Sequence, residues 1–340
     1  MDQVVTARAP AVDLREPALD IRGLRTEFRI GGRWHAAVRD VSLTLHANET
    51  LAIVGESGSG KSVTALSVLR LLPGAGARIG AGAVIFAGRD LMRLSEAEMS
   101  DVRGNAIAMI FQEPMTSLNP TMTIGDQIAE AIVVHRGAAW AFARAQALRL
   151  LDEVKIPAAA TRLDDYPHQF SGGMRQRVMI AMALACRPQV LLADEPTTAL
   201  DVTIQAQVLR QLAELKRAYG MAMLFITHNL GVVAQIADRV AVMYAGAIVE
   251  VASVADLFAR PMHPYTAALL RAMPRVDRYA KGLEPIPGGV PALTAMPSGC
   301  AYAPRCPLKQ PGCTAHHPDL LRFRDGHHVR CPVVLPGAGQ

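Results

Sequence analysis

The chain has 340 residues, a hydrophobic content of 51% and a formal net charge of +5, which excludes a largely disordered protein and allows one or two folded domains. The pI near 9.1 would suit an anionic partner, but no run of Lys and Arg concentrates the charge, so we expect no nucleic-acid partner. The longest apolar stretch, Val178 to Cys186, is about half of the roughly 18 to 20 residues that a membrane span needs. The first residues hold charges and prolines without an apolar segment, so we expect no secretory signal and a cytoplasmic protein.

The N-terminal part of the chain predicts strands followed by a helix. Apolar residues alternate between residues 20 and 54, and the last predicted strand is the apolar run Leu51 to Val54. A helical period over Ser62 to Leu72 predicts a helix that ends before Pro73. The turn between this strand and this helix is rich in glycine.

Strands and helices also alternate further along the chain. The remaining predicted elements are a strand over 83–86, an Ala-rich helical subdomain over 122–163 interrupted at Gly137 and Pro157, a strand over 190–193, a helix over 203–219 ending at Gly220, and a strand over 221–227. This alternation predicts an α/β fold with a parallel sheet and helices on both faces.

The glycine-rich turn fits the phosphate-loop pattern G-x-x-x-x-G-K-S. Its residues are Gly55, Glu56, Ser57, Gly58, Ser59, Gly60, Lys61 and Ser62. The glycines let backbone N–H groups close around phosphates, and the helix N-terminus adds a positive field. Lys61 is expected to reach the terminal phosphates of ATP, and the Ser62 hydroxyl to bind Mg²⁺. By itself the loop leaves kinases, GTPases, motors and transporters open.

Two carboxylates follow the predicted strand over 190–193. Asp194 is expected to hold the shell of the Mg²⁺ ion, and Glu195 to polarise the attacking water as a general base. A strand that delivers two carboxylates downstream of a phosphate loop is typical of the second nucleotide motif of P-loop ATPases.

Between these two motifs, the run from Phe170 to Arg177 (FSGGMRQR) resembles the signature of ABC ATPases. The resemblance implies that Ser171, Gly172 and Gly173 bind the γ-phosphate held by the opposite subunit of a dimer. Met174 departs from the family, which usually has Gln there. Since the chain carries one phosphate loop and one signature, the resemblance implies a second ATPase chain.

Three further segments resemble motifs of this family. Gln112 in the run FQEP resembles the Q-loop residue, which touches Mg²⁺ and relays to the transmembrane partner. Asp201 in TALD resembles the D-loop residue, and His228 in ITHN the switch histidine that contacts the γ-phosphate. The aromatic residue that stacks on adenine is left open between Phe28 and Trp34.

Prolines break the periodicity after Ala259 and indicate a separate C-terminal module. The predicted organisation is a tail over 1–18, an ABC ATPase domain over 19–260 with a helical subdomain at about 113–186, and a module over 261–340. The ATPase domain is expected to be a RecA-like P-loop core with a β subdomain. The runs HPYT at 263–266 and FQEPMTSLNP at 111–120 resemble ATPase subunits of oligopeptide, dipeptide and nickel importers, closest to their "D" type subunit.

Four cysteines lie in the C-terminal module, at Cys300, Cys306, Cys313 and Cys331. Four thiolates can bind Zn²⁺ or hold a [4Fe-4S] cube, and the absence of a tight C-x2-C pair favours the larger cluster. In the importer family such a quartet is associated with a [4Fe-4S] cluster. Zn²⁺ and unliganded thiols remain alternatives, the histidines at 316, 317, 327 and 328 are rival ligands, and Cys186 is expected in the core.

The resemblance implies an ATPase subunit that powers import of di- and oligopeptides at the cytoplasmic face of the inner membrane. Its implied partners are a second, homologous ATPase subunit forming a heterodimer, two transmembrane permease subunits and an extracytoplasmic substrate-binding protein. Nickel, haem or another small solute remain alternative cargoes. The rival class is the soluble ABC ATPases of translation or repair, which usually carry two cassettes or long coiled coils that this sequence lacks.

Overall fold

The computed structural model describes residues 16–198, 200–273 and 285–335. Most of the tail predicted over 1–18 lies outside these residues, and so does Ala199 of the predicted D-loop. Residues 274–284 and 336–340 of the predicted C-terminal module are also outside them.

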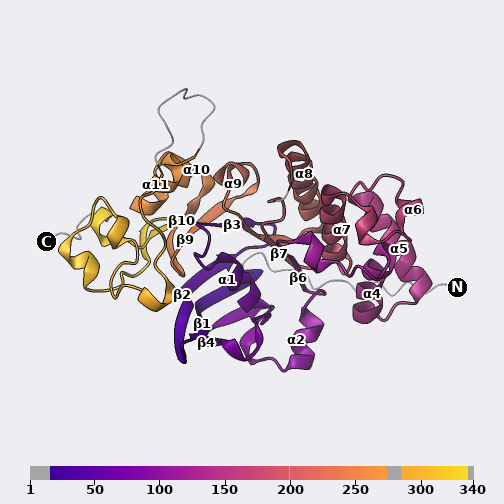
Figure 1. Cartoon of the computed structure of the whole chain (residues 1–340), viewed down its shortest axis with the longest axis horizontal. Coiled ribbons are helices and arrows are strands. Elements are labelled where there is room, and N and C mark those ends of the chain that lie inside the picture. Colours follow the sequence, from indigo (N-terminus) through magenta and orange to yellow (C-terminus); the bar gives the residue numbers. More distant parts are fainter. Residues whose placement is uncertain (1–15, 199, 274–284, 336–340) are drawn as a thin grey trace.

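Within the described residues, an eight-stranded sheet forms the centre of the fold, with strand order β11-β12-β10-β9-β3-β8-β7-β6 (Figure 1). Its strands are β3 (Thr50–Val54), β6 (Ile107–Ile110), β7 (Val190–Asp194), β8 (Ala222–Ile226), β9 (Arg239–Tyr244), β10 (Ala247–Ser253), β11 (Leu321–Arg324) and β12 (His327–Val329). The strands from β6 to β9 pair in parallel, as predicted. Beyond β9 the pairing is antiparallel, so the sheet is mixed and not purely parallel.

A second, antiparallel sheet packs on the first and has the order β2-β1-β4-β5. Its strands are β1 (Leu19–Ile30), β2 (Arg33–Leu45), β4 (Ala77–Phe86) and β5 (Arg89–Asp90). Strand β4 begins well before the predicted strand over 83–86, because its first half, rich in Ala and Gly and largely exposed, pairs with β1 without a buried apolar pattern that would mark it. This sheet is the predicted β subdomain.

The helices follow the predicted pattern with one early end. They are α1 (Lys61–Val68), α2 (Glu96–Val102), α3 (Pro114–Ser117), α4 (Ile124–Arg136), α5 (Trp140–Glu153), α6 (Ala159–Arg162), α7 (Gly172–Leu184), α8 (Val202–Tyr219), α9 (Leu230–Ile236), α10 (Val254–Ala259) and α11 (Pro264–Arg271). Gly137 and Gly220 end α4 and α8 as predicted, since both take left-handed φ values of 61° and 66°. Helix α1 ends before the predicted Leu72, because Arg70 has a φ of 53° that a right-handed helix cannot contain.

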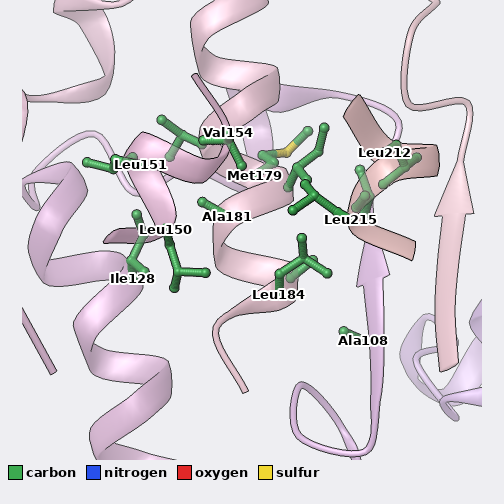
Figure 2. Packing of buried hydrophobic residues seen from close by; sticks show 14 of the residues in the cluster. Ala108, Ile128, Leu150, Leu151, Val154, Met179, Ala181, Leu184, Leu212 and Leu215 are labelled. Atoms are coloured by element: carbon green, nitrogen blue, oxygen red, sulfur yellow. The ribbon is translucent and has the colours of Figure 1, made fainter. Parts of the chain in front are cut away.

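The middle of the central sheet, at β3, β7 and β8, is buried on both faces. Side chains alternate along β7, so that Leu191 and Ala193 pack against the helices α4, α5, α7 and α8, while Val190 and Leu192 pack toward α1 and the antiparallel sheet. Figure 2 shows the first of these cores, with Met179 of α7 among the side chains of α5 and α8. The two cores therefore cover the two faces of β7.

The C-terminal region, described over residues 261–273 and 285–335, continues the central sheet. Strand β12 pairs with β10, with Val329 opposite Glu250, and so lengthens the central sheet. Tyr265 and Tyr302 join Tyr244 of β9 in one buried cluster. The predicted domain boundary at residue 260 therefore runs through a continuous sheet and a shared core, and the region is not separate in its packing.

Candidate nucleotide-binding site

The phosphate loop connects β3 to α1 and lies directly against neighbouring strands. A Cβ atom at Gly55 would lie 2.2 Å from the carbonyl oxygen of Met243 in β9. Gly60 has a φ of 103°, and a Cβ there would lie 2.8 Å from the carbonyl oxygen of Ala37. Only glycine fits these two positions, because any side chain would displace the strands.

Lys61 lies under the loop and is 5% exposed. Its Nζ donates to the carbonyl oxygens of Gly55 (2.9 Å) and Glu56 (3.0 Å). Burial lowers the pKa of Lys61, opposed by the charges of Glu195 and Asp194. The hydroxyl of Ser59 is also buried and, among the described residues, has no hydrogen-bond partner. An ammonium group and an unpartnered hydroxyl within a glycine loop fit the phosphates of a nucleotide.

Ser62 and Asp194 meet across the start of α1 and the end of β7. The Ser62 hydroxyl donates to Asp194 Oδ1 at 2.9 Å. Burial raises the pKa of Asp194, while the Ser62 hydrogen bond opposes the rise. A hydroxyl and a carboxylate are the hard oxygen donors that Mg²⁺ prefers, so this pair fits the expected magnesium position.

Glu195 follows Asp194 in the left-handed conformation, with a φ of 46°, which is strained for a residue with a side chain. Its Oε1 lies 3.1 Å from His228 Nδ1, and its Oε2 accepts from Thr198 Oγ1 (2.8 Å) and from Gln112 Nε2 (3.4 Å). Burial opposes ionisation, but the hydrogen bonds from His228 and Thr198 outweigh it and hold the pKa of Glu195 below its ordinary value. The carboxylate is therefore ionised at neutral pH and able to accept a proton.

These groups converge at the carboxyl ends of parallel strands, where ligands bind in α/β sheets. The structure thus brings together the predicted residues of the phosphate loop, Asp194, Glu195, Gln112 and His228. Sequence reasoning missed the hydroxyl of Thr198, which it named only within the D-loop run. A hydroxyl three residues after a carboxylate in a turn was the available signal.

The signature and D-loop residues occupy a different place. Ser171 caps α7 by accepting from the backbone N–H of Met174 (3.4 Å), and Asp201 caps α8 by accepting from that of Ile204 (2.9 Å). A Cβ at Gly173 would lie 2.9 Å from the Ile204 side chain, so the two helix starts pack together. Within the described residues, the side-chain bonds of Ser171 and Asp201 stay in their own helices and do not reach the phosphate loop.

The adenine-stacking residue stays open. The guanidinium of Arg78 lies 4.2 Å over the ring of Trp34, and both Trp34 and Phe28 are half-buried.

The four clustered cysteines line one largely apolar cavity together with Tyr302, Ala303, Leu308 and Val333. Burial raises the pKa of the Cys300, Cys306 and Cys331 thiols. Among the residues that the structure describes, no group of three or more Cys, His, Asp or Glu is placed to hold a metal ion. The expected quartet is thus gathered around one cavity, with its sulfur atoms not converged on a point.

The neighbouring histidines differ in their surroundings. His316 lines the same cavity, and His317 Nε2 lies 3.4 Å from a guanidinium nitrogen of Arg330. His327 is fully buried and its Nε2 lies 2.8 Å from Glu250 Oε1, so it serves the core and not the cavity. Cys186 is 1% exposed and lies in the core as predicted.

This geometry defines a P-loop nucleotide-binding site on a mixed α/β sheet. Comparisons with known proteins give the family. The family model described as "ABC transporter" matches residues 38–198, and that described as "Oligopeptide/dipeptide transporter, C-terminal region" matches residues 249–313. A putative peptide import ATP-binding protein of Brucella melitensis is 54% identical over 328 residues, which is 93% of this chain and 97% of that protein. The dipeptide transport ATP-binding protein DppD of Bacillus subtilis is 50% identical over 316 residues, 93% of this chain and 94% of that protein.

Among solved structures, a dimeric ATP-binding cassette in a post-hydrolysis state with ADP and Pi matches with a TM-score of 0.63 and 26% identity, covering 69% of this chain and 98% of that one. The chain belongs to the ATP-binding subunits of ABC transporters and carries the oligopeptide/dipeptide transporter C-terminal region. It is an ATPase of this family, and membership implies association with transmembrane permeases and a substrate-binding protein. No helix among the described residues is long and apolar enough to span a membrane.

Proposed function

We propose that this ATPase powers import of dipeptides or oligopeptides across the bacterial inner membrane, from the cytoplasmic face. Support comes from the Brucella relative, which is named for peptide import, and the Bacillus relative, which is named for dipeptide transport; both align over nearly the whole chain. The observation that carries hydrolysis is the ionised Glu195 next to the phosphate loop, held by His228 and Thr198.

The roles of the site residues are part of the proposal. The loop from Gly55 to Ser62 holds the phosphates, with Lys61 on the terminal ones, and Ser62 and Asp194 hold Mg²⁺, which neutralises phosphate charge. Glu195 accepts the proton of the attacking water, and His228 and Gln112 orient the reacting groups. A Lys61→Ala variant should bind MgADP at least about tenfold more weakly, because the buried ammonium is lost; unchanged affinity would contradict this assignment.

The signature residues complete a second subunit's site. Since Ser171, Gly172 and Gly173 do not reach this chain's own phosphate loop, they are free to face that of a partner, with Asp201 beside them. The matching cassette of known structure is dimeric. The partner in this proposal is a homologous ATPase chain, and the pair drives two permease subunits. An extracytoplasmic substrate-binding protein delivers the cargo to these permeases.

The test of the cargo is uptake by the reconstituted transporter. Labelled dipeptide or tetrapeptide should accumulate only with ATP, and Glu195→Gln in this chain should stop accumulation while the complex still assembles. ATP turnover that responds to a nickel chelate or haem, but not to any peptide, would establish one of the alternative cargoes instead.

We further propose that the four cysteines hold a [4Fe-4S] cluster in the C-terminal region, with the boundary near residue 260 marking its start in sequence. All four line one largely apolar cavity, and four cysteine thiolates are the usual ligand set of such a cluster. When bound, such a cluster would link the turns that carry Cys300, Cys306, Cys313 and Cys331.

Anaerobic purification tests the cluster directly. About four iron and about four sulfide per chain, lost in Cys313→Ser, would support the cluster. One zinc and no iron would contradict the cluster and indicate a zinc site. Finding neither metal would also contradict it and indicate four free thiols. A Cys186→Ser variant is the matched control, since that thiol is buried, donates to the Ala131 carbonyl and is not part of the cavity lining, so the change should not alter the metal content.

A further inference from the structure

Glu56, the second residue of the phosphate loop, is held on three sides. Its carbonyl oxygen accepts from Lys61 Nζ at 3.0 Å, within the loop itself. Its backbone N–H donates to the hydroxyl of Tyr265 at 2.9 Å, and its carboxylate receives the guanidinium of Arg305 at 2.9 and 3.2 Å. Two of the three contacts therefore come from the C-terminal region, about 200 residues or more away in sequence.

Arg305 is itself fixed on all sides. Its side chain is 5% exposed and donates to the carbonyl oxygens of Pro287 (2.7 Å) and Ile286 (3.2 Å). Its guanidinium carbon lies 5.7 Å from the ring centre of Tyr244 and 5.9 Å from that of Tyr302. A charged fork with this many fixed partners has lost its rotamer freedom, so it holds Glu56 in one place.

Tyr265 is held in the same way. It is fully buried, and its ring lies 4.6 Å from that of Tyr244 and 5.3 Å from that of Tyr302, centre to centre. Tyr244 belongs to β9, the strand whose Met243 carbonyl faces Gly55. The C-terminal region, which lies beside β9 and β10 in Figure 1, thus reaches the phosphate loop through one buried aromatic cluster.

We propose that Arg305, with Tyr265, is a positioning residue for ATP: it sets the phosphate loop through Glu56 and so raises nucleotide affinity without touching nucleotide. Tyr265 holds the backbone N–H of Glu56 and Arg305 its carboxylate, while Lys61 holds its carbonyl oxygen, so three different groups of this loop residue are fixed. A loop fixed before binding loses less conformational freedom when phosphates arrive, so affinity is higher.

The test is a double-mutant cycle in the full-length chain, with the dissociation constant for MgADP measured by titration calorimetry. Arg305→Met and Glu56→Gln should each weaken binding by about tenfold, and the double variant no further than either, because both act through one contact. Arg305→Lys keeps the charge but loses the fork and should fall between Arg305→Met and the unmodified chain.

Two controls separate positioning from general loss of structure. Arg324→Met removes another arginine of the C-terminal region, which pairs with Asp256 and does not contact the loop, and it should leave the dissociation constant unchanged. The Tm of each variant shows whether it is folded. If Arg305→Met does not fold, Glu56→Gln decides, since Glu56 is partly exposed and its replacement keeps the side-chain shape.

Three results on nucleotide binding would overturn the proposal, and one on turnover. They are unchanged MgADP affinity in a folded Arg305→Met or Glu56→Gln chain, additive effects in the double variant, and equal weakening by Arg324→Met. The turnover of ATP at saturation should change by less than about threefold in Arg305→Met, because the residue acts on binding and not on the reacting atoms. A loss confined to turnover would likewise contradict a positioning role.

Discussion

The nucleotide edge, where β3, β6, β7 and β8 end, and the C-terminal region lie on the same sheet but hold their polar groups in different ways. At the nucleotide edge, His228 is exposed, and the buried hydroxyl of Ser59 has no hydrogen-bond partner among the described residues. Where the C-terminal region packs on β10, Glu250 of that strand is fully buried and receives the backbone N–H groups of Met262 and His263 and the ring of His327. The polar groups at the nucleotide edge remain able to bond a ligand, whereas those around Glu250 bond to one another.

This contrast teaches that stability and chemistry should respond to different substitutions. A change in the buried C-terminal network should unfold the chain without a specific effect on hydrolysis. A change at the nucleotide edge should stop hydrolysis in a chain that remains folded. Four substitutions test the contrast, in order of decreasing expected effect.

Replacing Glu250 by Ala should have the largest effect. The change leaves the buried His327 ring and two buried N–H groups without their acceptor, which costs about 3 to 5 kcal/mol of unfolding free energy. The midpoint of urea unfolding measures this loss. Glu130→Ala, at an exposed position of α4, is the control and should stay within about 0.5 kcal/mol of the unmodified chain.

Glu195→Gln should lower ATP turnover by at least about 100-fold, or about 2.7 kcal/mol in the barrier, since the amide cannot accept the proton. Phosphate release by the assembled transporter measures the rate, and Tm should hardly change. Turnover equal to that of the unmodified chain would remove Glu195 as the general base and erase the distinction between the two regions.

His263 makes stability depend on pH. It caps α11 by accepting from the N–H of Tyr265, and burial together with the charge of Arg330 lowers its pKa to about 3. The unfolded chain takes up this proton below about pH 6.5 and the folded chain does not, so stability falls as the pH decreases from about 6.5 toward 3. Between pH 6.5 and 5 this amounts to roughly 2 kcal/mol.

The His263→Asn variant isolates this effect, because Asn can still accept at the helix start but does not titrate. Urea midpoints at pH 6.5 and 5 should differ less in the variant than in the unmodified chain. If the urea midpoint changes equally with pH in the variant and in the unmodified chain, groups other than His263 take up the proton.

Thr198→Val should have the smallest effect. Losing the hydroxyl that donates to Glu195 Oε2 raises the pKa of Glu195, so the acid limb of the pH–rate profile moves to higher pH. Turnover at neutral pH should fall about fivefold, near 1 kcal/mol. Thr161→Val is the control. It removes a hydroxyl that donates to the Ala158 carbonyl in the helical subdomain and should leave the pH–rate profile unchanged.

Contiguous motifs could be predicted from the sequence because their residues act together through local backbone geometry. The loop between β3 and α1, the carboxylates after β7 and the glycines ending α4 and α8 are of this kind. The early end of α1 could not be predicted, since Arg70 leaves the helix to donate to the carbonyl of Leu94, which is remote in sequence.

By itself the sequence determined the family, the nucleotide site and most of the elements on which that site is built. Only the tertiary structure decided that β12 extends the ATPase sheet and that Arg305 reaches Glu56. The physical reason is distance along the chain: a motif carries its own geometry, while a contact between remote segments exists only after the sheet and the aromatic cluster have packed. The C-terminal region looked separate in sequence because its prolines break local periodicity, which says nothing of the surface it packs on.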